Sequence, residues 1–306
     1  MDKNKLQIAG GGYIAEISTI GANCFSLRYP ALQADIIRSP KQEKEQTNFL
    51  FGIPILFPPN RIDRARFFFE NRLYELFKNE PNTNCSLHGT LHTEEFSVMK
   101  HTKREVVLQL ICPKDKPYIG GNNDFSITVG YRVGRLGLKQ SVAVENRSKM
   151  NMPLMLGFHT AFRLPFIQTS TAKDIRLRAE TDRYEIERDE RYLPTGRYVE
   201  NDYLKAMRVN GVQLDGDCSI HCKASGKGRI YLFDTQSNCK VTYKPDRIFN
   251  YRVFFKAGDG YICLEPQTCQ VNACNTEKKL LLIHPRQTKK MISYISVNGR
   301  VKNEKN

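Results

Sequence analysis

Apolar and polar residues alternate with a period of two along much of this chain. The alternation is clearest in segments 125–133, 138–144, 175–179, 240–243, 251–255, 261–264 and 292–297. A period of two is typical of β-strands that bury one face. Turn residues such as Gly258-Asp259-Gly260 and Asn298-Gly299 separate the segments. Strands that recur about every ten residues predict a β-sandwich or a β-barrel.

Helical periodicity is scarce and predicts only short helices, over residues 41–48 and 198–207. No internal repeat, low-complexity tract or linker divides the chain. A long chain made mostly of strands needs two large sheets that pack face to face. We therefore predict one all-β domain over residues 1–306, built as a large antiparallel β-sandwich, with a frayed tail after about residue 301.

The chain is basic, with 47 Lys and Arg against 32 Asp and Glu and a net charge of +15. The basic residues are scattered, and no nucleic-acid-binding motif accompanies them, so we predict a basic solvated surface and no nucleic-acid partner. The longest uncharged run is too short to span a bilayer, and the first residues of the sequence are not followed by an apolar stretch of the kind expected in a signal peptide. Nine cysteines, an odd number, then predict a cytoplasmic protein with free thiols and no membrane association.

Two segments in the first third of the chain do not follow the strand pattern. The proline-rich segment 52–62 cannot be a central strand, because proline has no backbone donor. It ends near Arg61, whose planar guanidinium suits vicinal hydroxyls or a carboxylate, although an isolated arginine is more often a surface residue. Segment 86–92 carries His88 and His92, but the Gly and Thr between them disfavour a metal-binding helix.

Two later segments carry candidate acid–base groups. His159 lies in the apolar run 152–162, where a buried structural histidine is the commoner role. As a catalyst, an imidazole with a pKa near 6.5 could both give and take a proton. Glu265 follows an apolar strand and precedes Pro266, so it is either a solvated strand-end carboxylate or a general base. None of these segments identifies a function alone.

Together, and in this order, the segments resemble the aldose 1-epimerase, or galactose-mutarotase-like, family. The matching elements are Asn60-Arg61-Ile62, Leu87-His88-Gly89, Gly157-Phe158-His159, the acidic turn at Asp215 and Asp217, Glu265-Pro266-Gln267-Thr268 with Asn272, Ala273 and Asn275, and Leu282-Ile283-His284-Pro285 before the strand 292–297. The resemblance extends from about residue 14 to about residue 297. It rests on several short motifs in one order rather than on one diagnostic motif.

The resemblance implies a galactose-mutarotase-like supersandwich with a sugar cleft across one sheet. It also implies that the α and β anomers of an aldohexose are interconverted by ring opening and reclosure, without a metal or other cofactor. Glu265 would take the proton of the C1 hydroxyl and His159 would protonate the ring oxygen. His88 would polarise the ring oxygen, and Arg61 would hydrogen-bond the ring hydroxyls together with one acidic side chain.

The acidic turn offers two candidates for that side chain, Asp217 and Asp215, of which Asp217 fits the family spacing better. The family's aromatic stacking residue also has several candidates: Phe67 to Phe69, Phe158 and Phe249. Thr160-Ala161-Phe162 departs from the family sequence and is expected to alter the floor near His159. A metal site at Cys218, His221 and Cys222 is disfavoured, because in a strand these side chains would not share one face.

Three alternative functions and the assembly state stay open at this stage. A hexose 6-phosphate could be the substrate, with its phosphate held by Arg64, Arg66 or Arg72. The fold could instead bind carbohydrate without catalysis. The charge by itself suggests a nucleic-acid-binding β-protein, which the missing motif disfavours. The protein is expected to be a monomer or a homodimer.

Overall fold

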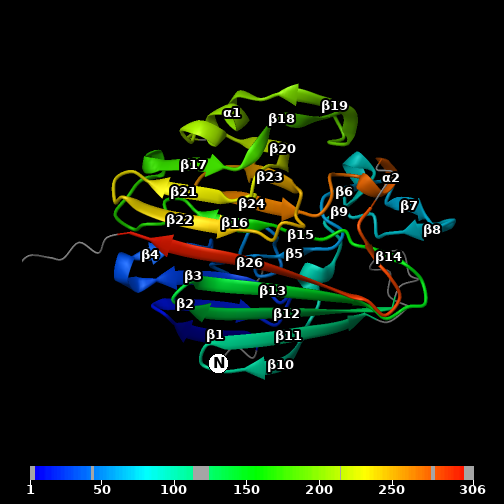
Figure 1. Ribbon diagram of the computed structural model, residues 1–306, viewed down its shortest axis with the longest axis horizontal. Helices are drawn as coiled ribbons and strands as arrows, with labels where there is room; N and C mark the ends of the chain where they lie inside the picture. Colours follow the sequence, from blue (N-terminus) through cyan, green and yellow to red (C-terminus); the bar gives the residue numbers. More distant parts are fainter. Residues whose placement is uncertain (1–3, 43–44, 113–123, 214, 277–279, 300–306) are drawn as a thin grey trace, which may run out of the picture.

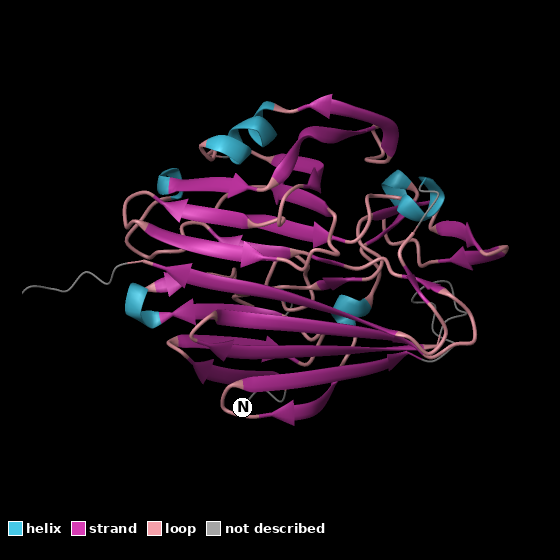
Figure 2. Ribbon diagram, viewed as in Figure 1, coloured by secondary structure: helices cyan, strands magenta, loops and turns pink. Residues whose placement is uncertain are grey.

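Two large antiparallel sheets form the centre of the computed structural model (Figure 1). The structure describes residues 4–42, 45–112, 124–213, 215–276 and 280–299. Strands predominate over a few short helices (Figure 2). The prediction of a large antiparallel all-β fold is therefore confirmed. The prediction of a single domain over residues 1–306 stays a prediction, and the tail after residue 301 lies outside the described residues.

One large sheet combines strands from the middle and the end of the chain. In order across the sheet, its strands are β10 (Ser97–His101), β11 (Glu105–Cys112), β12 (Phe125–Gly134), β13 (Gly137–Asn146), β26 (Thr288–Asn298), β22 (Cys239–Lys244), β21 (Ile230–Asp234) and β17 (Ile175–Ala179). We call it sheet I. A four-stranded sheet lies beside it and consists of β1 (Lys5–Gly10), β2 (Tyr13–Ser18), β3 (Cys24–Tyr29) and β4 (Ala34–Asp35).

The other large sheet, sheet II, supplies most of the candidate site. Its order is β19 (Pro194–Glu200), β18 (Thr181–Arg188), β20 (Cys218–Ala224), β23 (Tyr251–Lys256), β24 (Tyr261–Gln267), β15 (Gly157–Phe158) and β5 (Ile55–Leu56), and β16 (Thr160–Arg163) also pairs with β24. Three short ladders join β6 (Arg61–Asp63) to β9 (Cys85–Leu87), β7 (Arg66–Phe69) to β8 (Arg72–Glu75), and β14 (Met152–Pro153) to β25 (Leu282–Ile283).

The helical elements are short. They are α1 (Asp202–Val209), α2 (Ala273–Thr276) and the 3-10 turns η1 (Pro30–Leu32), η3 (Pro81–Thr83), η4 (Leu91–Thr93) and η5 (Ala172–Asp174). The helix predicted over 198–207 begins later, because β19 continues to Glu200 and Asn201 then caps α1 by accepting a hydrogen bond from the Leu204 N–H at 3.1 Å. A helix was also predicted over residues 41–48. The residues of this range that the structure describes do not form an α-helix.

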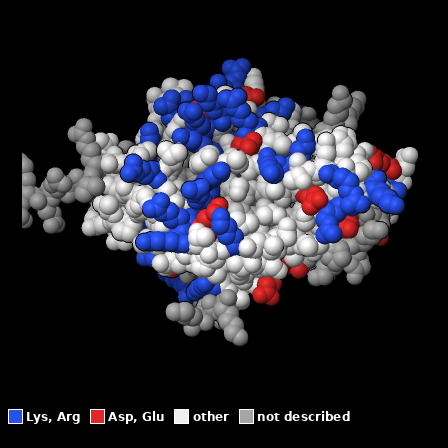
Figure 3. Space-filling view, turned by 60° about the horizontal axis from the view of Figure 1, so that its bottom comes forward, with Lys and Arg blue, Asp and Glu red and all other residues white. Residues whose placement is uncertain are grey.

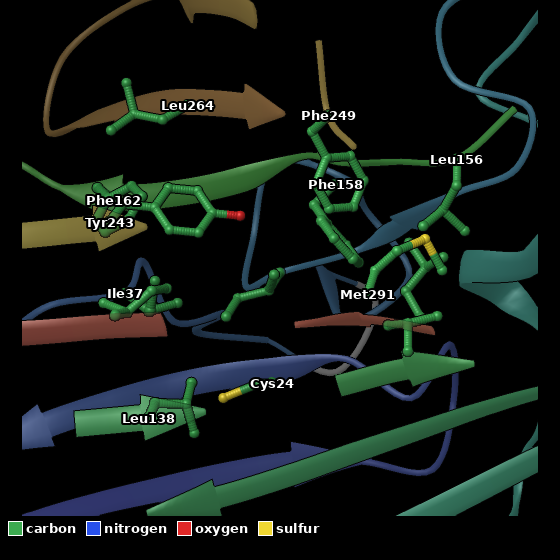
Figure 4. Close-up of a cluster of buried hydrophobic side chains, with 14 of the residues drawn as sticks. Cys24, Ile37, Leu138, Leu156, Phe158, Phe162, Tyr243, Phe249, Leu264 and Met291 are labelled. Carbon is green, nitrogen blue, oxygen red and sulfur yellow. The ribbon is translucent and has the colours of Figure 1, made fainter. Parts of the chain in front are cut away.

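The apolar alternation of the sequence becomes the core between the sheets. On β12, Ile127, Val129 and Tyr131 are fully buried. Figure 4 shows large side chains from several elements meeting in this core, among them Phe158 beside Phe249, with ring centroids 5.3 Å apart. Burying one large apolar side chain contributes roughly 1.5–3 kcal/mol, so such clusters hold the sheets together.

Two smaller findings concern the cysteines and the membrane prediction. None of the nine cysteines forms a disulfide in the part of the chain that the structure describes. No helix over the described ranges is long and apolar enough to cross a membrane.

Candidate active site

The floor of the candidate site consists of side chains on one face of three adjacent strands of sheet II. The strand register places His221 of β20 beside Val253 of β23, and Val253 beside Glu265 of β24. Ser219 and Phe255 form the next row. Alternate residues of a strand point to the same face, so all five side chains face one side. They line a cleft with a volume of about 540 Å³.

His159 reaches this floor from the short break between β15 and β16. Gly157 lies opposite Gln267 and Thr160 lies opposite Leu264, so His159 comes to lie beside Glu265. His159 Nε2 and Glu265 Oε1 are 3.1 Å apart, within hydrogen-bond distance, and both side chains are at most 3% exposed. The second carboxyl oxygen of Glu265 accepts a hydrogen bond from Gln267 Nε2 at 3.1 Å.

The prediction of a strand-end position for Glu265 is wrong, because β24 continues through Pro266 to Gln267. The fixed backbone angle of proline is compatible with an extended strand. The solvated role considered for Glu265 is therefore excluded, since the residue is 2% exposed. His159 is as deeply buried as a core histidine would be, but it contacts a carboxyl group.

Burial shifts the pKa values of both groups toward their neutral forms. It raises the pKa of Glu265 to about 8 and lowers the pKa of His159 to about 3. At any pH between these two pKa values, the Glu265 and His159 side chains share one titratable proton. The pair is net neutral whether that proton lies on Glu265 or on His159, which suits a buried position.

One wall of the cleft comes from β6 and β9, which lie next to each other in Figure 1. The Asn60 N–H donates to His88 Nδ1 at 3.1 Å, and the His88 N–H donates to the Asn60 carbonyl at 3.0 Å. Burial, the largest cause, holds the pKa of His88 well below its usual range, so this imidazole is neutral. Because Nδ1 accepts a hydrogen bond, Nε2 carries the ring hydrogen, and His88 is a donor.

Arg61 enters the cleft from the same wall and is held on two sides. Its guanidinium donates to both carboxylate oxygens of Glu80 at 2.6 Å, and its carbon lies 4.4 Å from the centre of the Tyr192 ring. Glu80 also accepts a hydrogen bond from Thr83. Hydrogen bonds from Arg61 and Thr83 outweigh the effect of partial burial and lower the pKa of Glu80. Glu80 thus fixes the orientation of Arg61 and balances its charge.

The two candidate aspartates lie in different pockets. Asp217 lines the cleft, and its carboxylate accepts a hydrogen bond from the Gly258 N–H at 2.6 Å. Asp215 lines a neighbouring pocket of about 500 Å³ that does not contain His159 or Glu265. The structure therefore separates the two alternatives and brings Asp217, not Asp215, to the cleft.

None of the aromatic residues considered from the sequence lines the cleft. Phe67, Phe158 and Phe249 are at most 1% exposed and belong to the core, whereas Phe68 is 71% exposed. The aromatic residues of the cleft are Phe49, Tyr192 and Phe255. The Phe49 ring centre lies 5.1 Å from that of His159 and 4.9 Å from that of His88, so Phe49 covers both imidazoles.

The segment after His159 and the disfavoured metal site were also considered from the sequence. Thr160, Ala161 and Phe162 are buried beneath the cleft rather than part of its lining. No group of three His, Cys, Asp or Glu residues within the described ranges could hold a metal ion. His221, which the sequence suggested only as a disfavoured metal ligand, lines the cleft instead.

The cleft also contains residues that the sequence did not indicate. Glu80, Tyr192 and Phe49 belong to none of the motifs, and no local pattern distinguishes them. Each reaches the cleft through tertiary contacts. By contrast, Glu265, His159, His88, Arg61 and Asp217 were all selected from the sequence, and all line this one cleft.

Comparison with known proteins gives the family. The sequence profile of the aldose 1-epimerase family matches residues 4–291. The chain belongs to the aldose 1-epimerase family. The chain is 22% identical over 290 residues to one relative, the uncharacterized protein YihR of Escherichia coli (strain K12). The aligned region covers 91% of this chain and 88% of YihR.

Solved structures support the same assignment. A galactose mutarotase-like protein from Clostridium acetobutylicum superimposes on this family member with a TM-score of 0.90 and 26% identity, over 96% of this chain and 95% of that one. Galactose 1-epimerase from Lactobacillus acidophilus NCFM has a TM-score of 0.70 and 14% identity, over 94% and 92% of the two chains. At that identity the second likeness shows the fold alone, which is the galactose-mutarotase-like fold.

Proposed function

We propose that this protein is an aldose 1-epimerase that interconverts the α and β anomers of a free aldohexose. The observation that carries the proposal is the contact of His159 Nε2 with Glu265 Oε1, 3.1 Å apart on the floor of the cleft. In a cyclic aldose, the hydroxyl oxygen at C1 and the ring oxygen are bonded to the same carbon. An acid and a base that touch each other can therefore reach both oxygens of one substrate.

The reaction needs one proton removed and one delivered at the same time. When the shared proton lies on His159, Glu265 is a carboxylate and takes the proton of the C1 hydroxyl. His159 gives its proton to the ring oxygen, the bond from C1 to the ring oxygen breaks, and a carbonyl forms at C1. Rotation about C1–C2 followed by the reverse steps yields the other anomer. Ring opening leaves Glu265 protonated and His159 neutral, and ring closure by the reverse steps returns the proton to His159, so the pair holds one proton throughout.

The other cleft residues have roles that follow from their contacts. His88, neutral and protonated on Nε2, can donate to the ring oxygen as negative charge develops there. Arg61 is fixed by Glu80, and Asp217 lies across the same cleft, so together they offer a donor and an acceptor to ring hydroxyls. Phe49 limits the access of water to the imidazoles.

The arrangement of basic residues supports a free sugar rather than a sugar phosphate. Arg64, Arg66 and Arg72, the candidates for a phosphate site, are exposed and do not line the cleft. Arg61 does line it, but its charge is balanced by Glu80. A phosphate in the cleft would gain little from Arg61 without displacing that carboxylate.

The test is the initial rate of mutarotation of α-glucose, α-galactose and glucose 6-phosphate, measured by polarimetry, for the wild-type protein and for Glu265→Gln and His159→Asn. Each substitution should lower the rate by about 10²–10⁴-fold, because each removes one acid–base group. Asp215→Asn is a matched control outside the cleft and should behave as wild type. If both cleft variants match an active wild type, His159 and Glu265 are not its acid–base pair; a wild type no faster than the uncatalysed reaction would favour carbohydrate binding without catalysis. Activity confined to glucose 6-phosphate would overturn the free-sugar proposal.

A further inference from the structure

Sheet I carries an aromatic–basic surface on its outer face, at the end formed by β22, β21 and β17. Along β21, Ile230 and Leu232 point into the core, so Tyr231 and Phe233 point outward. The register puts Arg178 of β17 opposite Tyr231, and Lys240 of β22 opposite Phe233 on the other side. Two aromatic rings are thus flanked by cations from both neighbouring strands.

The rings and the cations are close enough to act together. The ring centres of Tyr231 and Phe233 are 5.9 Å apart, with an angle of 33° between the ring planes. The Lys240 ammonium lies 5.8 Å from the first ring centre and 5.7 Å from the second. Both rings are partly exposed, so a planar ligand group can reach them.

Helix α1 borders this part of the sheet, and Arg208 in its last turn lines a groove there. The groove has a volume of about 380 Å³ and is lined by Arg178, Ala179, Glu180, Arg208, Ser225, Tyr231, Phe233 and Lys240. A second hollow, which also contains Arg208, is lined by Asp182, Arg183, Lys205 and Val209, and its Arg183 and Lys205 are paired with Glu200. Figure 1 shows α1 above β17. In the space-filling view of Figure 3, a dense group of Lys and Arg lies at the top of the view, and further groups lie to its left and right.

The charge of the groove is not balanced internally. Arg178, Arg208 and Lys240 form no salt bridge with any carboxylate that the structure describes. The one acidic residue of the groove, Glu180, accepts hydrogen bonds from the backbone N–H groups of Lys227 and Arg229 at 2.9 and 3.1 Å. Three cations are therefore available to a polyanion beside two rings.

We propose that this groove, defined by Arg178, Arg208, Tyr231, Phe233 and Lys240, binds single-stranded nucleic acid. Phosphates pair with cations along such a track, and unpaired bases stack on aromatic side chains. A duplex keeps its base faces covered and would leave the rings unused. Neither an anionic membrane nor an acidic protein surface supplies regularly spaced phosphates together with planar rings. The expectation of no nucleic-acid partner rested on scattered basic residues and the absence of a sequence motif, whereas the groove is assembled from three strands and a helix.

The groove shares no residue with the candidate active site, so its test is independent of the proposed function. Binding of fluorescein-labelled dodecamers of deoxythymidine and of uridine is measured by anisotropy at 50 and 200 mM KCl. Arg178→Glu with Arg208→Glu should weaken binding at least tenfold and reduce the dependence of log Kd on log salt by about two. Tyr231→Ala with Phe233→Ala should also weaken binding at least tenfold, with an unchanged salt dependence, because stacking carries no charge.

Arg66→Glu with Arg72→Glu is the matched control, because it changes the net charge equally on the distant β7–β8 hairpin. This control should stay within twofold of the wild type. Equal weakening by the control would overturn the proposal, since net charge alone would then explain binding. Two other results would also overturn it: a duplex that binds as tightly as the single strands, or a ring variant that binds as wild type. Circular dichroism spectra that match the wild type establish that the variants are folded.

Discussion

Replacing Glu265 by Gln keeps the shape of a buried side chain and removes its titration. Burial raises the pKa of this carboxyl from 4.5 to about 8, and the residue is 2% exposed, so solvent screens the effect little. Below pH 4.5 the carboxyl is protonated in both the folded and the unfolded chain. Above it, the unfolded chain releases the proton while the folded protein keeps it. The free energy of unfolding of the wild type therefore falls, relative to that of the variant, as the pH rises toward 8.

The magnitude follows from the size of the pKa shift. One pH unit within this window corresponds to about 1.4 kcal/mol, so from pH 5 to pH 8 the free energy of unfolding of the wild type should fall by about 4 kcal/mol relative to Glu265→Gln. His159 does not alter this difference in stability. In the folded wild type, Glu265 and His159 together hold one titratable proton, whichever of them carries it, whereas in the folded Glu265→Gln variant the side chains at these two positions hold none.

Urea unfolding of both proteins at pH 5, 6, 7 and 8, followed by circular dichroism, measures the difference directly. Equal slopes with denaturant would show that the two unfolding transitions expose the same surface. A difference in stability that stays constant across this range would refute the reasoning. It would mean that Glu265 ionises normally in the folded protein and that the pair with His159 carries no shared proton.

Three further predictions concern activity. The value of kcat/KM should be level between about pH 5 and pH 7 and should fall above about pH 8, where the pair formed by Glu265 and His159 loses its shared proton. A continued rise of kcat/KM through about pH 9 would contradict this prediction. Glu80→Gln should raise KM about tenfold, equivalent to about 1.4 kcal/mol, and change kcat little, because it frees Arg61; a loss confined to kcat would disprove the positioning role. Asp217→Asn should raise KM roughly threefold to tenfold while Asp215→Asn has no effect, and equal effects would show that the cleft assignment is wrong.

The strands were predictable because their signal is local. In β12 and β13 the alternation of apolar and polar residues matches the alternation of buried and partly exposed side chains. The helix predicted over 198–207 was displaced because its first residues pair with β18, an interaction that local propensity does not contain. Pro266 likewise lies inside β24, although proline usually marks the end or the edge of a sheet.

The candidate site was predictable only in part. His159 and Glu265 each had a commoner structural explanation, and their joint appearance with the other motifs selected them. Their contact, their shared proton and their shifted pKa values come from the register of β15, β16 and β24. The sequence favoured Asp217 over Asp215 only through the spacing of the family it resembles, and the pockets that the two residues line separate them.

By itself, the sequence determined the all-β class, the resemblance to a family and a short set of candidate residues, because periodicity and motifs are properties of neighbouring residues. Only the tertiary structure decided that Glu80 holds Arg61, that Phe49 covers the two imidazoles, and that Tyr231 and Phe233 lie in a groove with Arg208. These contacts join residues from different elements, so they depend on strand order and packing. Burial, which sets the protonation of the Glu265 pair, exists only once the sheets have come together.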